Sequence, residues 1–431
     1  MSHDDGSGWS AAAFLRDFAQ LSTIGATPRG GVDREAATVR DGMARAWLGG
    51  WLASRGFAVA VDGIGNQFGL LDLVPGAPYV LAGSHLDSQP TAGRLDGAYG
   101  VVAAAFAAHR VAAGARAGTV RPTRNLAVVN WFNEEGSRFG PSMMGSAVFT
   151  GRLDADEALR TTDPAGVTVR DALDGIDGRG GPVPLPVGSY AEIHIEQGRE
   201  LEETGDRIGV VTGTWAARKF RFRVLGEQSH TGSTRMADRR DALLGASLLV
   251  VEARSLADRF AEAPLHTAVS QLDVRPNSPV VVAAEVRANL DLRSPDPAVL
   301  DAAVHRLRDV AARVEAERGL RVELELTHSW DRDDYTPECV AVSERVCAEL
   351  GVPARRMLTV AGHDSTNMAK VVPTAMLFVP SREGISHNER EDTAPDDLVT
   401  GVDVLTGVVR ELVTAPGSGP DRQPWTPAST G

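Results

Sequence analysis

The stretch "YVLAGSHLDSQPTAGRLDGAYGVVAAAFAAHRVAAG", residues 79–114, joins an apolar run, a polar turn and an alanine-rich segment. The apolar run is typical of a buried strand, and the periodic bulk of the last segment is typical of a helix. The polar turn between them holds His85, Asp87 and Asp96. A strand that passes through a polar turn into a helix predicts an α/β layered domain, in which functional sites lie at such strand ends.

The flanking sequence continues this alternation. Residues 34–56 carry a helical pattern, and short apolar strands are expected near 57–62 and 67–73. After the alanine-rich segment, "NLAVVNWFNEEG" (125–136) indicates a buried strand that ends in charged residues. We therefore predict an α/β domain with polar side chains gathered at one edge of its sheet.

The order of elements changes from about residue 214. The pattern predicts a strand at 217–226, a helix at 239–261, strands at 266–274 and 280–293, a helix at 297–317 and a strand at 320–328. This βαββαβ order is ferredoxin-like. Residues 357–381 return to α/β alternation, so we predict a catalytic domain of residues 1–213 and 331–414 that is interrupted by an inserted domain, residues 214–330. The tail, residues 415–431, is rich in Pro, Gly and Ser and is predicted to be disordered.

The composition excludes several functional classes. The 431 residues carry a formal net charge of −13, which argues against nonspecific binding to nucleic acid or to an anionic membrane. The N-terminus has no signal-peptide pattern, and no apolar run approaches the roughly 20 residues that span a membrane. The two cysteines, Cys339 and Cys347, suggest neither a disulfide framework nor a thiolate metal site. We expect a cytoplasmic protein.

The opening stretch offers a first group of metal-ligating side chains. Residues two apart on a strand face the same side, so His85 and Asp87 can lie together, with Asp87 accepting the second N–H of the imidazole. Asp96 lies in the turn before the helix, where Gly93 and Gly97 leave room for close approach. His85 could equally be a hydrogen-bonded histidine at a strand end, and Asp96 a helix cap. The stretch alone does not decide.

A pair of glutamates follows the next predicted strand, in "NWFNEEGSRFG". Adjacent residues point to opposite sides, so one of the two glutamates, Glu134 and Glu135, could bind a metal while the other acts as a base. Without such a role, two unpaired glutamates after a buried strand would be costly. The alternative is that the strand end is exposed to solvent.

Two further histidines complete the inventory for a two-metal site. His194 in "AEIHIEQG" and His387 in "GISHNERED" both close apolar segments. One ion would be held by two histidines and the other by a histidine and Glu135, with Asp96 bridging. Mixed nitrogen and oxygen ligation suits Zn²⁺ best, and Mn²⁺, Co²⁺ or Ni²⁺ could compete.

Seven ordered motifs now carry a family resemblance, over about residues 20–413: "GSHLDSQPTAGRLDGAYGVVAA", "NEEGSRFGPSMMGS", "HIEQG", "IGVVTG", "GEQSHTGSTRMADRRDA", "AGHDS" and "GISHNERED". In this order they resemble the hydantoinase/carbamoylase group of the M20 metallopeptidase superfamily. The resemblance implies a large catalytic domain with two metal ions and an inserted lid and dimerisation domain. It implies that Glu134 is the general base, that Asp87 orients a ligand, and that the metal ligands are His85, Asp96, Glu135, His194 and His387.

The resemblance also implies a reaction. Members of this group, such as N-carbamoyl-L-amino acid hydrolases, allantoate amidohydrolases and β-ureidopropionases, cleave a ureido or amide C–N bond next to a carbon that bears a carboxylate. Residues at the matching positions would bind substrate: Arg293 and Asn277 would hold the carboxylate, and His230 of the partner subunit in a homodimer would stabilise the oxyanion. A surface ion pair of Arg293 with Asp291 or Asp296 is the alternative.

Several positions stay undecided at this stage. Gln197 could reach the substrate or make a structural hydrogen bond, and His363 and Asp364 are expected to support a loop beside the site. The chain departs from the group's usual pattern at Ala92, Leu95, Arg235 and Glu389, and Trp215 and Arg235 leave the substrate open. A dipeptidase or N-acyl amino acid amidohydrolase is the competing enzyme. An inactive metal-binding scaffold is the competing class, and retention of the base and all five ligands argues against it.

Overall fold

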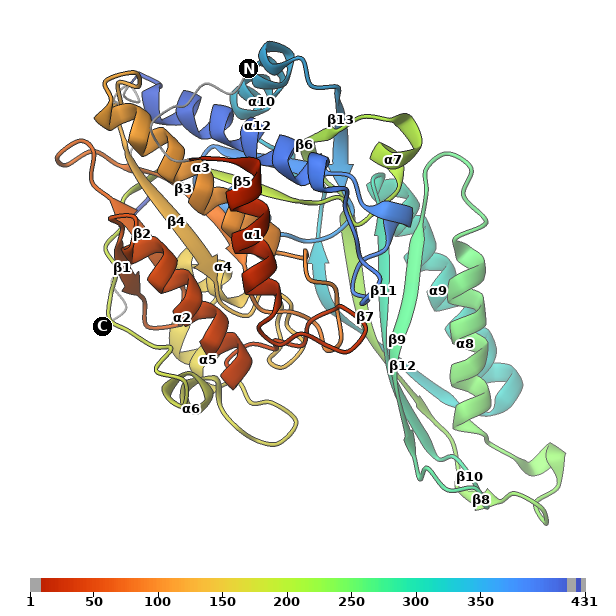
Figure 1. Ribbon diagram of the computed structural model, residues 1–431. Coiled ribbons are helices and arrows are strands. Elements are labelled where there is room, and N and C mark those ends of the chain that lie inside the picture. The colour runs from red at the N-terminus through yellow and green to blue at the C-terminus, as the bar shows by residue number, and fades with distance from the viewer. Residues whose placement is uncertain (1–8, 417–423, 428–431) are drawn as a thin grey trace. The chain divides into compact units, whose positions relative to one another are not determined.

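The computed structural model of the chain describes residues 9–416 and 424–427 and divides into two compact units (Figure 1). Unit 1 comprises Met1–Thr212, Tyr335–Met357 and Gly362–Gly431. Unit 2 comprises Gly213–Asp334 and the short segment Leu358–Ala361. The sequence predicted two crossings between the units, near residues 213 and 331. The chain makes two further crossings, at the two ends of the segment Leu358–Ala361.

Unit 1 contains an eight-stranded sheet in the order β1-β2-β4-β3-β5-β14-β6-β13. The central strands β4, β3, β5 and β14 are parallel, whereas β1 and β2 form an antiparallel edge and β6 pairs antiparallel with β14. Its strands are β1 (Ala58–Val61), β2 (Gln67–Leu71), β3 (Tyr79–His85), β4 (Asn125–Trp131), β5 (Val187–Ile195), β6 (Ile208–Thr214), β13 (Ala354–Thr359) and β14 (Thr374–Val379).

Helices cover both faces of this sheet. Strand β3 alternates between two cores: Val80 and Ala82 pack among α1, α2, α3, α10 and α12, and Leu81 packs on the other side with residues of α4 and α11. Burial on both faces explains why the central strands are almost wholly apolar in sequence. The helices of unit 1 are α1 (Ala11–Ser22), α2 (Val39–Ala53), α3 (Ala98–Arg116), α4 (Met144–Phe149), α5 (Ala155–Arg160), α6 (Val169–Asp174), α7 (Glu200–Thr204), α10 (Pro337–Leu350), α11 (Asp364–Met368), α12 (Pro395–Thr414) and the 3-10 helix η2 (Arg382–Gly384).

Helix α3 corrects one expectation from the sequence. Among the described residues it is the one helix long and apolar enough to cross a membrane by length and composition. Its most apolar 18-residue window is 83% buried inside the protein. The alanines and valines of α3 pack against β3, β5 and α12, so α3 is a core helix of unit 1.

Unit 2 contains a four-stranded antiparallel sheet in the order β12-β7-β11-β9, reached through the chain order β7-α8-β9-β11-α9-β12. Alternate residues such as Phe220, Phe222 and Leu292 pack under α8 and α9 on one face, and among the described residues of unit 2 no helix packs on the other face. A short ribbon of β8 and β10 extends one end of the unit. The elements are β7 (Ala216–Leu225), β8 (Ser229–His230), η1 (Met236–Asp238), α8 (Ala242–Leu256), β9 (His266–Arg275), β10 (Val281–Val282), β11 (Glu285–Ser294), α9 (Pro297–Arg318) and β12 (Arg321–Trp330).

Some boundaries differ from those read in the sequence. Helix α8 begins later than residue 239 because the Asp241 side chain caps it, accepting the main-chain N–H groups of Leu243 and Leu244. The tail predicted for residues 415–431 lies partly outside the described residues, at 417–423 and 428–431. Trp425 is described, and it exchanges two main-chain hydrogen bonds with Val187, of 2.7 and 2.9 Å.

Candidate metal centre

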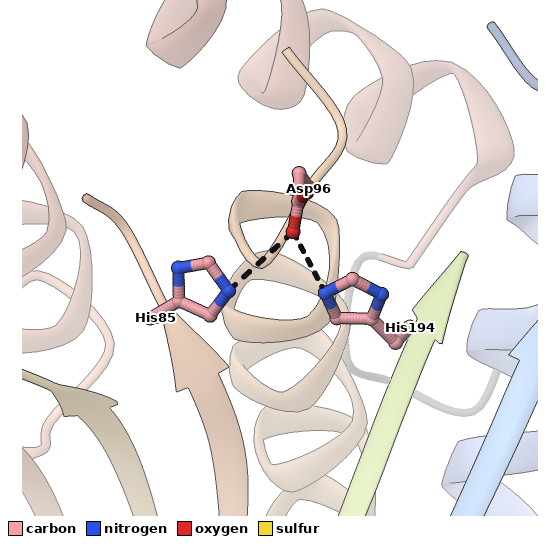
Figure 2. Close-up of side chains that lie close together, drawn as sticks. All are labelled: His85, Asp96 and His194. Carbon is pink, nitrogen blue, oxygen red and sulfur yellow. Dashed lines mark ion pairs between the residues drawn. The ribbon is translucent and has the colours of Figure 1, made fainter. Parts of the chain in front are cut away.

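Two histidines and an aspartate meet at one end of the unit 1 sheet (Figure 2). His85 is the last residue of β3, and His194 lies one residue before the end of the neighbouring parallel strand β5. Asp96, in the turn before α3, points its Oδ1 between them, at 3.5 Å from His85 Nε2 and 3.0 Å from His194 Nε2. Strand ends and a helix start therefore deliver three ligand atoms to one point, where all three residues are buried.

A second group uses the other oxygen of the same aspartate. Asp96 Oδ2 lies 3.2 Å from His387 Nε2, which in turn lies 3.4 Å from Glu135 Oε2. In each group the three ligand atoms lie within 4.8 Å of one another. The structure thus brings the five proposed ligands together as two groups that share Asp96: His85 and His194 in one, Glu135 and His387 in the other.

Hydrogen bonds to main-chain carbonyls orient the two buried imidazoles. His85 Nδ1 donates to the carbonyl of Asp87 at 2.9 Å, and His194 Nδ1 donates to the carbonyl of Ile195 at 2.9 Å. A carbonyl can only accept, so each Nδ1 carries the hydrogen and each Nε2 faces the shared aspartate. This is the tautomer that a histidine ligand needs.

The carboxylate of Asp87 has a different partner from the one expected. Its Oδ1 lies 3.7 Å from His85 Nδ1, whereas its two oxygens accept the main-chain N–H groups of Glu134 and Glu135, each at 3.2 Å. Strand β3 ends at His85, so the alternation that would have placed Asp87 beside the imidazole does not extend that far. Asp87 fixes the turn that carries the two glutamates.

Glu134 stands beside the first group without belonging to either. Its Oε2 lies 3.5 Å from His85 Nε2, and its side chain is largely buried. Burial raises the pKa of Glu134 well above its ordinary value; the charge of His85 opposes this, and Asp364 and Glu135 add to it. A carboxyl with a raised pKa, aimed at a cluster of ligand atoms, has the character of a general acid and base.

The surrounding charges favour cations at the two groups. Burial opposes ionisation of Asp96, but hydrogen bonds from His194, His387 and His85 hold its pKa well below the ordinary value. Burial raises the pKa of Glu135 to about 7, and the hydrogen bond to Asp96 is the main cause that raises the pKa of His387 to about 9. The carboxylates thus attract positive charge to the Nε2 atoms of these histidines, where a proton and a metal ion compete. A divalent cation meets the same attraction.

Four further residues hold the ligands, and the sequence reading missed all but Gln197. Gln197 Nε2 donates to Asp96 Oδ2 at 2.9 Å, and Ser386 Oγ donates to the same oxygen at 3.2 Å. Glu391 Oε1 accepts the main-chain N–H groups of Leu95 and Asp96, at 2.9 and 3.0 Å. Gln89 Nε2 donates to Glu135 Oε2 at 3.0 Å. Gln197 therefore makes the structural hydrogen bond that was one of its two expected roles.

A buried polar layer lies behind the first group. The rings of His194 and His363 are 4.6 Å apart, and Asp364 accepts a hydrogen bond from Ser146 Oγ. Glu192 accepts from Ser84 Oγ at 2.8 Å and from the main-chain N–H of Ser365 at 2.9 Å. Glu192 could have been found from the sequence, because it lies two residues before His194 on the same strand and shares its face.

Arg293, in unit 2, is held in a fixed orientation. Its Nε and Nη2 donate to the Asp291 carboxylate, with the shortest distance 2.7 Å, and its Nη1 donates to the Val360 carbonyl at 2.8 Å. The pairing with Asp291 that the sequence allowed is thus present. A guanidinium has five N–H donors, so one N–H on each terminal nitrogen remains for a ligand.

His230 and Asn277 do not lie near Arg293 within one chain. His230 pairs with Val281 in the β8–β10 ribbon, next to the Glu285 end of β11, whereas Arg293 is close to the other end of that strand. Eight residues of strand correspond to roughly 27 Å. The expectation that Asn277 adds a hydrogen bond beside Arg293 therefore fails for a single chain, because Asn277 belongs to the loop at the ribbon end.

The comparison with family models gives one match. Residues 81–411 match Peptidase family M20/M25/M40, a span that includes both ligand groups and unit 2. The chain belongs to this family.

Curated relatives and solved structures narrow the similarity within the M20 family. The chain is 55% identical over 406 residues to a protein of Mycolicibacterium smegmatis that is named as an unconfirmed hydrolase, covering 93% of this chain and 92% of that protein. It is 33% identical to an N-carbamoyl-L-amino-acid amidohydrolase of Rhizobium meliloti (91% and 94% covered) and 31% identical to an allantoate amidohydrolase of Escherichia coli (91% and 95% covered). An amidase of the hydantoinase/carbamoylase family from Burkholderia vietnamiensis has a similar structure, with a TM-score of 0.89, 36% identity and coverage of 96% and 100%.

The donor set fits the metal dependence of the M20 family. Each group offers imidazole nitrogen and carboxylate oxygen, the ligands that Zn²⁺ and the neighbouring divalent metals accept. Outer partners hold four of the five proposed ligands: carbonyls hold His85 and His194, Gln89 holds Glu135, and Gln197 with Ser386 holds Asp96. Such partners are usual around functional metal ligands.

Gly97 gives a direct test of the first ligand group. Its φ is +62°, and a Cβ at this position would lie 2.3 Å from Nε2 of His85. We expect Gly97→Ala to displace the imidazole and to lower the content of tightly bound metal, measured by elemental analysis after dialysis. The backbone strain alone costs about 1–2 kcal/mol.

Gly118 is the matched control, because its φ is +75° and a Cβ there would meet nothing within 4 Å. Gly118→Ala should lower the free energy of unfolding by a similar strain while the metal content stays unchanged. Full metal content in Gly97→Ala would contradict the assignment of His85 as a ligand.

Proposed function

We propose that this chain hydrolyses the C–N bond of an N-carbamoyl-L-amino acid, or of a similar ureido compound that carries a carboxylate, with two divalent metal ions of which Zn²⁺ is the best fit. The observation that carries the proposal is the pair of ligand groups that share Asp96, with Glu134 3.5 Å from His85. Relatives that act on N-carbamoyl-L-amino acids and allantoate support C–N hydrolysis as the reaction class.

The residues of unit 1 divide the chemistry between binding and proton transfer. His85, His194 and Asp96 would hold one ion, and Glu135, His387 and Asp96 the other. When bound, the ions supply an acidified water and a Lewis acid for the carbonyl. Glu134 takes the proton of the attacking water and passes it to the nitrogen that leaves. For a carbamoyl substrate, the products are the amino acid and a carbamate that breaks down to CO₂ and ammonia.

Unit 2 would supply substrate binding and dimerisation as a ferredoxin-like lid. Its residues 214–330 are the proposed inserted domain, and the two free N–H groups of Arg293 suit the substrate carboxylate. Arg293 and His230 lie too far apart on one chain to contact one small substrate. We therefore propose a homodimer in which His230 of the partner subunit stabilises the oxyanion and Asn277 of the partner subunit adds a hydrogen bond.

A substrate screen tests the proposal. Metal-stripped protein would be loaded with Zn²⁺, Mn²⁺, Co²⁺ or Ni²⁺ and assayed on carbamoyl, ureido, formyl and acyl amino acids. We expect metal-dependent ammonia release from the carbamoyl or ureido compounds. Absence of hydrolysis with every metal and every substrate, in protein that contains two ions per chain, would favour the inactive scaffold.

An N-acyl amino acid amidohydrolase or dipeptidase is the second candidate, because the same ligand groups would serve it. The screen separates the two enzymes. A site built to bind the terminal NH₂ of a ureido group rejects acyl analogues, since its polar groups would stay unpaired. Faster hydrolysis of acetyl or aminoacyl derivatives than of carbamoyl derivatives would establish the second candidate.

Arg293→Ala is expected to weaken hydrolysis of carboxylate substrates selectively. Loss of charge-assisted hydrogen bonds costs on the order of 1.5–3 kcal/mol, which corresponds to about tenfold to a few hundredfold in kcat/KM. The comparison uses a carboxylate substrate and its amide, with wild-type protein and the Ala and Lys variants. Metal content should not change. An equal loss on both substrates would show that Arg293 supports the sheet or the dimer contact instead.

A further inference from the structure

Arg293 lies in a row of side chains that crosses the helix-free face of the unit 2 sheet. In register, the row contains Trp330 on β12, Ala217 on β7, Arg293 on β11 and His266 on β9. Directly paired residues share one face, and Leu292 beside Arg293 packs under the helices on the other. His266 is therefore an immediate neighbour of Arg293, one strand away at about 4.8 Å.

An aromatic surface continues from His266. The indole of Trp215 lies against the imidazole, with ring centroids 4.8 Å apart, and the main-chain N–H of Trp215 donates to the Thr359 carbonyl at 2.8 Å. Arg293 is anchored to the same short segment through Val360. Trp215 and Arg293 are thus both tied to residues 358–361. Trp215 directly precedes β7 and His266 begins β9, so the two rings meet across β11, the strand that carries Arg293.

Within the row, Trp330 lies two strands from Arg293, whereas His266 lies one strand away. Ala217, between Trp330 and Arg293, has a small side chain that is fully buried. The Trp330 ring lies one strand further away, and Lys219 Nζ is 5.3 Å from its centroid. A group attached next to a carboxylate held by Arg293 therefore lies nearer to the pair of Trp215 and His266 rings, which we call the aromatic wall, than to the Trp330 ring.

The surroundings of His266 disfavour a positive charge on its ring. Partial burial, and then the charge of Arg293, lower the pKa of His266 below its ordinary value. A neutral imidazole in contact with an indole favours apolar and aromatic groups, which gain contact area and ring stacking. A second carboxylate or ureido group would lose water there without gaining a partner.

We propose that Trp215 and His266 form a side-chain subsite next to Arg293, which selects ureido compounds with an aromatic or large apolar group on the carbon that bears the carboxylate. This inference rests on the proposed function and deepens it by naming the class of substrate. Trp215 and His266 are specificity-determining residues in this assignment, because the carboxylate and the side chain of an amino acid branch from the same carbon.

The test compares two substrates that differ only in the side chain, N-carbamoyl-L-phenylalanine and N-carbamoylglycine. Metal-loaded wild-type protein should prefer the phenylalanine compound by at least about tenfold in kcat/KM, the value of a filled apolar pocket. Trp215→Ala and His266→Ala should each remove most of that preference and leave the glycine compound within about twofold. His266→Phe, which keeps a neutral ring, should retain the preference.

Trp330→Ala is the matched control, since it removes an indole from the same row, two strands away from Arg293. It should change neither substrate's kcat/KM by more than about twofold. Equal losses on both substrates in Trp215→Ala and His266→Ala, or a loss of preference in Trp330→Ala alone, would overturn the subsite. If Trp215→Ala does not fold, His266→Ala and His266→Phe carry the test.

The outcomes also separate this inference from the proposed function. Wild-type protein that hydrolyses neither carbamoyl compound contradicts the proposed function. Wild-type protein that hydrolyses N-carbamoylglycine as well as, or better than, N-carbamoyl-L-phenylalanine contradicts the subsite alone.

Discussion

Glu134→Gln is expected to lower kcat by about 100-fold or more, because general base catalysis commonly contributes 10² to 10⁴. The amide keeps the shape of the side chain but cannot take a proton from water. Glu134 belongs to neither ligand group, so the metal content should stay at the wild-type value. Steady-state kinetics with a hydrolysed substrate, combined with elemental analysis of the same sample, measures both quantities.

Glu411→Gln is the control for this substitution. The Glu411 carboxylate lies on α12 and pairs with Arg345 at 2.8 Å, away from both ligand groups. It should leave kcat unchanged. Near-normal turnover in Glu134→Gln would require the base to be reassigned, with Glu135 as the first candidate.

Asp96→Asn is expected to abolish binding of both proposed ions, which no other single substitution among the five proposed ligands should do. Each oxygen of Asp96 serves a different group, and the substitution removes the one negative charge common to His85, His194 and His387. Substitution of a residue that only hydrogen-bonds to a metal ligand lowers activity by up to roughly 100-fold, and Asp96→Asn should lower activity by more than that. Elemental analysis after dialysis, with isothermal titration of Zn²⁺ into stripped protein, measures the effect.

Asp403→Asn supplies the matched control. The Asp403 carboxylate accepts from Arg110 Nη1 at 2.6 Å on the surface of α12, and its neutralisation should leave metal binding intact. Two tightly bound ions in Asp96→Asn would disprove the shared ligand. One retained ion would show which group binds metal without Asp96.

The sequence predicted the parts of the site that local pattern controls. The strand–turn–helix pattern around His85 and the apolar segment around His194 indicated side chains at strand ends, where the structure has them. His387 lies in a bend well after β14 ends at Val379, yet its side chain also reaches the site. The βαββαβ order of unit 2 followed from alternating periodicity, because each of its elements has one buried face.

Long-range partners could not be predicted in the same way. Glu391 holds the turn at Asp96 from 295 residues further along the chain, and no local pattern marks such a contact. The predicted contact between the Asp87 carboxylate and the His85 ring was wrong because β3 ends at His85, two residues before Asp87. The composition of residues 415–431 indicated disorder, but Trp425 pairs with the start of β5. Two main-chain hydrogen bonds and one packed indole are enough to hold this residue, and the composition of the whole segment does not reveal such a short contact.

The length of strand β11 has a consequence for how variants combine. It separates Arg293 from the ribbon that carries His230 by most of its ten residues. In the proposed homodimer, each polypeptide would contribute Arg293 to one active site and His230 to the other. The unit that a gene encodes would then differ from the unit that performs catalysis. Consider a cell in which one allele alters Arg293 and the other alters His230. A dimer of one copy of each would have one site with both residues altered and one site with both residues intact.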